Sequence, residues 1–74
     1  MTAKQLIEIH GTSLIGQRVD TEAIGEYPGG IATVTELAPD PQAPEIVFTV
    51  QHPSYGDIGV FDWELVTLVS TPAG

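Results

Sequence analysis

Glycines and prolines interrupt this chain so often from Leu14 onward that only short strands fit between them. The turn-forming stretches are residues 25–30, residues 38–44 and residues 52–57. Proline fixes φ and cannot donate to a neighbouring strand, whereas glycine admits positive φ, so each stretch predicts a turn or a loop. The sequence therefore predicts an all-β domain with tight connections.

Between the turns lie runs of β-branched and aromatic residues, which are typical of strands. The five predicted strands are Arg18–Ala23, Ile31–Leu37, Glu45–Val50, Ile58–Phe61 and Leu65–Val69. In the third strand, the alternation of side chains puts Ile46, Phe48 and Val50 on the inward face. Residues 62–64 suit a single 3₁₀ turn before the last strand.

The N-terminal residues follow a different pattern. Thr2 and Gln5 have the spacing of a capping box, and Gly11 could end a short helix over residues 3–10. Alternating apolar residues in the same stretch make a short strand the alternative. The predicted organisation is an N-terminal segment over residues 1–13, a β-domain over residues 14–69 and a disordered tail over residues 70–74.

Size and composition allow one domain with a thin core. A chain of 74 residues buries only about 60% of its unfolded surface. Hydrophobic residues make up 42% of the chain, which is too apolar for a disordered protein. Because the chain has no cysteine, disulfides, iron–sulfur clusters and thiolate zinc sites are excluded.

The charge is strongly negative: ten acidic residues face one lysine and one arginine, for a net charge of −8 at pH 7. Such a field repels nucleic-acid phosphates and favours basic partners, so direct nucleic-acid binding is not expected. Solubility alone is the simpler reason for this charge. No apolar run reaches the roughly 18–20 residues of a membrane span, and the N-terminus does not resemble a signal peptide. We therefore expect a soluble, cytoplasmic protein that does not bind membranes.

Two parts of the chain resemble a known architecture. Gly16–Val19 followed by Gly29–Val34 is similar to the opening strands of KOW, Tudor and related SH3-like barrels. Phe61–Leu68 is similar to their closing 3₁₀ turn and final strand. The resemblance implies a five-stranded SH3-like barrel over roughly residues 14–69. It implies no function, because many unrelated functions occur on this barrel. In size and acidity the chain also resembles small proteins of bacteria and their phages.

The sequence departs from the functional patterns of those relatives. It lacks the basic residues of nucleic-acid-binding KOW domains, and it lacks the clustered aromatic residues of peptide-binding SH3 domains and Tudor cages. The resemblance therefore implies the architecture and leaves the partner open.

Few residues could carry catalysis or hold a metal. His52 precedes Ser54 in a turn, so a contact between a serine and a histidine base is conceivable, although an ordinary turn explains both residues. His52 with Asp57 could form only a weak metal site, because the spacing of zinc and EF-hand ligands is absent. Asp62 and Glu64 are expected to cap backbone amides or to remain solvated. We predict no catalytic residue, no cofactor and no metal.

Three aromatic residues in turns, Tyr27, Tyr55 and Trp63, could meet on one side of a barrel. The acids predicted to surround them are Glu26, Asp57, Asp62 and Glu64. Aromatic rings surrounded by carboxylates suit a cationic peptide, through burial of the rings and cation–π contact. The alternative is that Trp63 plugs one end of the barrel while the tyrosines fasten loops.

These observations favour a non-catalytic interaction module that binds a basic protein surface or peptide. One alternative is an inhibitor of the phage type, whose carboxylates imitate nucleic-acid phosphates and block a nucleic-acid-binding enzyme. Another is a structural subunit of a phage particle or other assembly. Leu6, Ile7 and Ile9 could supply a patch for self-association if the barrel leaves them exposed, so we expect a monomer or a weak homodimer.

Overall fold

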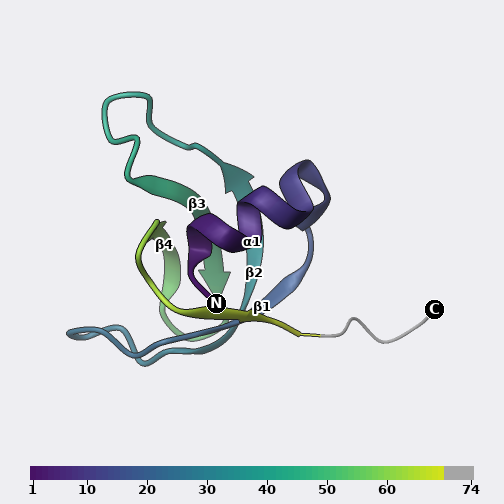
Figure 1. The fold of residues 1–74 in the computed structure, drawn as a ribbon. Coiled ribbons are helices and arrows are strands. Elements are labelled where there is room, and N and C mark those ends of the chain that lie inside the picture. Colours follow the sequence, from purple (N-terminus) through teal and green to yellow (C-terminus); the bar gives the residue numbers. More distant parts are fainter. Residues whose placement is uncertain (70–74) are drawn as a thin grey trace.

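The computed structural model describes residues 1–69, which form one curved antiparallel sheet with a short helix lying across it (Figure 1). The elements in chain order are helix α1 (Ala3–His10), a 3₁₀ helix (Gly11–Leu14) and strands β1 (Arg18–Thr21), β2 (Gly30–Leu37), β3 (Ile46–His52), β4 (Gly56–Phe61) and β5 (Val66–Leu68). The prediction of a mainly β domain with five short strands is confirmed. The predicted tail over residues 70–74 lies outside the described residues.

The strands pair in the order β4-β3-β2-β1-β5, so the last strand returns to lie beside the first. Every neighbouring pair is antiparallel. Among the described strands β4 and β5 do not pair with each other, so the sheet is open and has two edges. We predicted a closed five-stranded barrel, and the structure has the five strands in an open sheet.

The N-terminal segment is a helix, and its capping box decides between the two predicted alternatives. The Thr2 hydroxyl accepts from the Gln5 amide at 3.2 Å, and the Gln5 side chain accepts from the Thr2 amide at 2.9 Å. The next two amides donate to the turn over residues 62–64: Ala3 to the Glu64 carbonyl at 2.8 Å and Lys4 to the Asp62 carbonyl at 3.1 Å. The helix start is therefore tied to the connection between β4 and β5.

Helix α1 packs against β3, β4 and β5, and so reaches both edge strands of the sheet. Its buried residues are Ala3 and Leu6. They join Leu14 and the inward side chains of the strands in one core, which also contains Val19, Ala32, Val34, Phe48, Val50, Val60 and Val66. Leu6 is absorbed into this core and Ile7 packs against it, whereas Ile9 is exposed. The helix and the sheet thus share one core.

A bulge in β3 corrects one predicted side-chain direction. Ile46 pairs with Phe61 and Phe48 pairs with Val60, so Val47 is an extra residue between two successive pairs. Because Phe48 and Val60 face the core, Ile46 faces the opposite side, where its side chain lies over Gly59. The prediction that Ile46 points inward is wrong, since alternation fails across a bulge.

Strand β1 ends at Thr21, and residues 22–29 form a loop that folds back on itself. Within this loop Ile24 and Tyr27 bond to each other through their backbones at 2.9 and 3.1 Å. The two arms of the loop meet at Gly29, where a Cβ atom would lie 2.6 Å from the Ala23 nitrogen. Glycine is thus required at position 29 by the close approach of backbone as well as by its φ of 72°.

Candidate protein-interaction surface

Tyr27, predicted as part of an exposed aromatic group, is buried and holds the β1–β2 loop. Its hydroxyl bonds to the Thr21 hydroxyl at 2.5 Å, and Thr21 in turn donates to the Gly30 carbonyl at 2.8 Å. Since Thr21 uses its proton on the carbonyl, Tyr27 must be the donor to Thr21. The ring packs edge-on against His52 and Tyr55, with centroid distances of 5.3 Å in both cases. Tyr27 therefore fastens a loop, as the alternative interpretation of the tyrosines proposed.

His52 is buried and caps the turn between β3 and β4. Its Nδ1 atom accepts from the amides of Ser54 at 3.1 Å and Tyr55 at 3.2 Å. Because amides can only donate, Nδ1 carries no proton, and Nε2 donates to the Gly29 carbonyl at 2.7 Å. The ring thus joins the β3–β4 turn to the β1–β2 loop.

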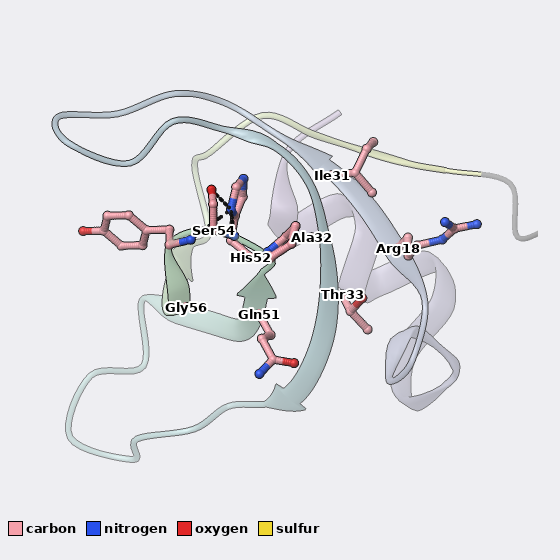
Figure 2. Close-up of a pocket in the computed structure, with 10 residues that line it drawn as sticks. Arg18, Ile31, Ala32, Thr33, Gln51, His52, Ser54 and Gly56 are labelled. Atoms are coloured by element: carbon pink, nitrogen blue, oxygen red, sulfur yellow. Dashed lines mark hydrogen bonds between the residues drawn. The ribbon is translucent and has the colours of Figure 1, made fainter.

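The contact between Ser54 and His52 that the sequence makes conceivable is present, with 3.1 Å between the Ser54 hydroxyl and Nδ1 (Figure 2). Its surroundings do not suit nucleophilic catalysis. The lone pair of Nδ1 already receives two amide protons, so it is not available to remove the proton of the serine. Both residues lie at an open groove of about 730 Å³ on the sheet. The Arg18 side chain, which also lines this groove, points away from them (Figure 2).

Trp63 is the most exposed aromatic side chain among residues 1–69, with 60% of its surface accessible. It stacks on Phe61 at a centroid distance of 5.8 Å and an interplanar angle of 11°. The interpretation of Trp63 as a plug for the barrel is wrong, because α1 covers the core with Ala3 and Leu6. Trp63 instead presents a large aromatic surface to solvent on a turn that is bonded to the helix start.

Beside Trp63 is a small pocket of about 170 Å³, which we call the edge slot. Its lining residues come from three elements, namely the β1–β2 loop (Ile24, Tyr27), strand β4 (Ile58, Gly59, Phe61) and the turn after it (Trp63, Glu64). The walls are mostly apolar, and Glu64 provides the charged group. Tyr27 and Trp63 therefore line one pocket, whereas Tyr55 lines the larger groove, so the three rings do not form a single group.

Glu64 is buried, and its Oε2 atom accepts from the Phe61 amide at 2.8 Å. Burial raises the pKa of this carboxyl above its ordinary value, and the nearby charge of Glu22 raises it further, although the bond from Phe61 opposes both effects. Glu22 itself accepts from the Leu65 amide at 3.3 Å. Two carboxylates from residues distant in sequence therefore create a negative potential at one end of the edge slot.

The other predicted acids are placed differently. Glu26 is exposed at the tip of the β1–β2 loop, and Asp57 is exposed on β4 opposite Gln51. Asp62 is half-buried in the turn next to Trp63. Of the two roles expected for Glu64, capping a backbone amide is the one observed. The sequence analysis did not include Ile24, Gly59 or Glu22. An isolated isoleucine beside a glycine in a loop was the only local signal for Ile24.

No family model matches the chain, and no curated protein or solved structure matches it. Within residues 1–69 no three histidine, aspartate or glutamate side chains are grouped so that they could hold a metal ion. No helix in this part of the chain is long and apolar enough to cross a membrane.

Proposed function

We propose that this protein is a non-catalytic interaction module, and that it binds a basic protein surface or peptide through Trp63 and the edge slot. The observation that carries the proposal is the exposure of Trp63. The Trp63 side chain, stacked on a second ring, has 60% of its surface accessible. Exposing this apolar surface to water is unfavourable, and the ring contributes little to the core. Large exposed aromatic residues of this kind are frequent energetic centres of protein interfaces.

The charge supports a basic partner. The charge of Glu22 lies close enough to Glu64 to raise the pKa of Glu64, so a cation placed between the two carboxylates and the indole would be attracted by both. The net charge of −8 adds a long-range attraction for the same partner. Exposed Ile24, which also lines the slot, adds apolar area to the surface.

We also infer that the sheet belongs to the SH3-like type of small barrel. Three features support this inference: the strand order, the return of β5 to β1 and the single turn that precedes β5. In that arrangement α1 occupies the space between the unpaired edges, because it contacts both β4 and β5. The loop, the turn and the edge strand then meet where the slot lies.

A Trp63→Ala variant tests the proposal. Binding of a lysine-rich peptide, measured by isothermal titration calorimetry, should weaken at least tenfold, since truncating a central aromatic residue at an interface costs about 2 kcal/mol or more. Ile9→Ala is the matched control, because Ile9 is exposed to a similar extent on the helix. Thermal unfolding should show both variants folded.

Equal binding by the Trp63→Ala variant and the wild type would overturn the proposal. If that binding also fell steeply with salt, the affinity would come from dispersed carboxylates, and the nucleic-acid mimic would become the better explanation.

A further inference from the structure

Strand β4 has an outer edge that no described strand occupies. β4 pairs only with β3. The Phe61 amide donates to Glu64 Oε2 at 2.8 Å, and the Phe61 carbonyl accepts from the Glu64 amide at 3.1 Å. Both backbone groups of Phe61 therefore face away from β3. Because successive residues of a strand direct these groups to opposite sides, Gly59 and Asp57 direct theirs toward the same open side.

The other edge of the sheet, formed by β5, is bonded to the N-terminal residues. The Val66 amide on β5 donates to the Met1 carbonyl at 2.8 Å, and Leu65 forms a bridge with Thr2. The N-terminal residues thus cover the start of β5. Strand β4 contacts α1, but among residues 1–69 no strand pairs with its outer edge, and its bonds on that side are those of Phe61 with Glu64. It contains neither the lysine nor the proline with which proteins commonly protect an edge.

The edge slot lies at this open edge. Gly59 lines the slot and is half-buried, with the Ile46 side chain lying over it. Ile24 forms part of the facing wall. A cavity of about 150 Å³ holds a molecule of benzene, so the slot, at about 170 Å³, has room for one side chain. An extended chain paired with Asp57 and Gly59 would direct alternate side chains toward it.

The slot suits a long basic side chain. Methylene groups would lie along Ile24 and Trp63, while the charged end would reach Glu64. Glu64 commits Oε2 to the Phe61 amide, and its other oxygen accepts no hydrogen bond from residues 1–69. Glu22 adds a second negative charge nearby. A lysine or arginine would therefore be held both by apolar contact and by a charge-assisted hydrogen bond.

We propose that a basic, extended segment of a partner protein adds to β4 as a sixth strand, pairing with Asp57 and Gly59 and placing a lysine or arginine side chain in the edge slot beside Glu64. This inference rests on the proposed function and specifies its binding mode. Main-chain pairing supplies affinity in such complexes, and the pocket selects the side chain.

Amide hydrogen exchange of the ¹⁵N-labelled full chain tests the pairing. The probe is an eight-residue peptide of alternating threonine and valine with one central lysine. In the free protein the amides of Asp57 and Gly59 should exchange rapidly, whereas those of Ile58 and Val60, which face β3, should exchange slowly. Saturating peptide should slow exchange at Gly59 at least tenfold and leave Ile58 unchanged. The four amides lie on one strand and control for each other.

Slow exchange at Gly59 in the free protein would overturn the inference, because the edge would already be occupied. Absence of binding would overturn it too. Peptide binding without any slowing at Gly59 would refute strand addition, while the proposed function, tested with Trp63→Ala, would stand. The proposed function and strand addition are both supported if Trp63→Ala loses binding of the lysine-rich peptide and the wild type shows slowed exchange at Gly59 with peptide bound.

The choice of a basic side chain has its own test. Replacing the central lysine of the peptide by norleucine, which keeps the stem and removes the charge, should weaken binding at least tenfold. Glu64→Gln should abolish this preference while keeping an acceptor for the Phe61 amide. Equal binding of the lysine and norleucine peptides by the wild type would refute the basic occupant. Because the peptide carries this change, the result does not depend on the stability of a variant.

Discussion

At the scale of single residues, buried polar groups decide how the loops are held. Tyr27, in the β1–β2 loop, bonds to Thr21 at the end of β1. His52, at the end of β3, bonds to the carbonyl of Gly29 at the end of the same loop. A buried donor or acceptor that loses its partner costs about 1–3 kcal/mol. Moving the loop would break these bonds, so they hold in place the loop whose residues Ile24 and Tyr27 line the edge slot. Among residues 1–69 no buried side-chain nitrogen or oxygen lacks a partner.

Glu64 carries a residue-scale prediction about pH. Its pKa in the folded protein is raised above the ordinary value of 4.5 by burial and then by Glu22. In the range just above 4.5 the folded state therefore binds more protons than the unfolded state. Unfolding free energy should then fall as pH rises through that range, and the loss should persist at higher pH.

The measurement is urea denaturation of the wild type and the Glu64→Gln variant between pH 4 and 7 (about 25 °C). The variant has no carboxyl at this position, so its stability relative to the wild type should increase with pH. Acids that do not interact with Glu64 titrate alike in both proteins and cancel in the difference. A constant difference across this range would show that Glu64 has no raised pKa.

At the scale of elements, helix α1 belongs to the core of the sheet. Leu6 is 1% exposed and lies among strand side chains, whereas Ile9 on the same helix is 62% exposed. The helix is also bonded to the turn that carries Trp63. Its loss would therefore affect both the core and the candidate surface.

Leu6→Ala should lower the unfolding free energy by about 2–5 kcal/mol, because it leaves a cavity in a thin core. Ile9→Ala should change it by less than about 0.5 kcal/mol. Chemical denaturation followed by tryptophan fluorescence measures both, since the only tryptophan lies next to the helix start. Similar effects of the two substitutions would mean that α1 does not share the core.

At the scale of the whole molecule, one sign of charge dominates. The ten acids, offset by only two bases, repel each other in the folded state more than in the expanded chain. The melting temperature should therefore rise as sodium chloride increases from about 10 mM to about 500 mM, because the screening length shortens from about 30 Å to less than 8 Å. Differential scanning calorimetry measures the shift. A melting temperature that falls with salt would contradict the prediction.

Much of the fold follows from local patterns. The capping residues Thr2 and Gln5 predict the helix, and the glycines and prolines predict where strands end, since both act through backbone conformation within a few residues. The bulges at Thr35 and Val47 are exceptions, because an extra residue in one strand is defined only against its partner.

The candidate site was only partly predictable. Trp63 and Glu64 were found from the sequence, which left two alternatives open for each: exposure or a place inside the barrel for Trp63, and a backbone cap or full solvation for Glu64. The turn puts Trp63 in solvent, whereas Glu64 turns inward to the Phe61 amide. Glu22 joins the site from 42 positions away in the sequence, and no local pattern encodes that contact.

The amino-acid sequence alone determined the short strands, the helix start, the acidity and the absence of cysteine chemistry, since these depend on composition and on neighbours along the chain. Only the tertiary structure decided which aromatic rings are buried, which edge of the sheet is open and which acids meet. Those outcomes depend on how distant segments pack. In this chain the packing places the unpaired edge of β4 beside an exposed tryptophan and a buried carboxylate.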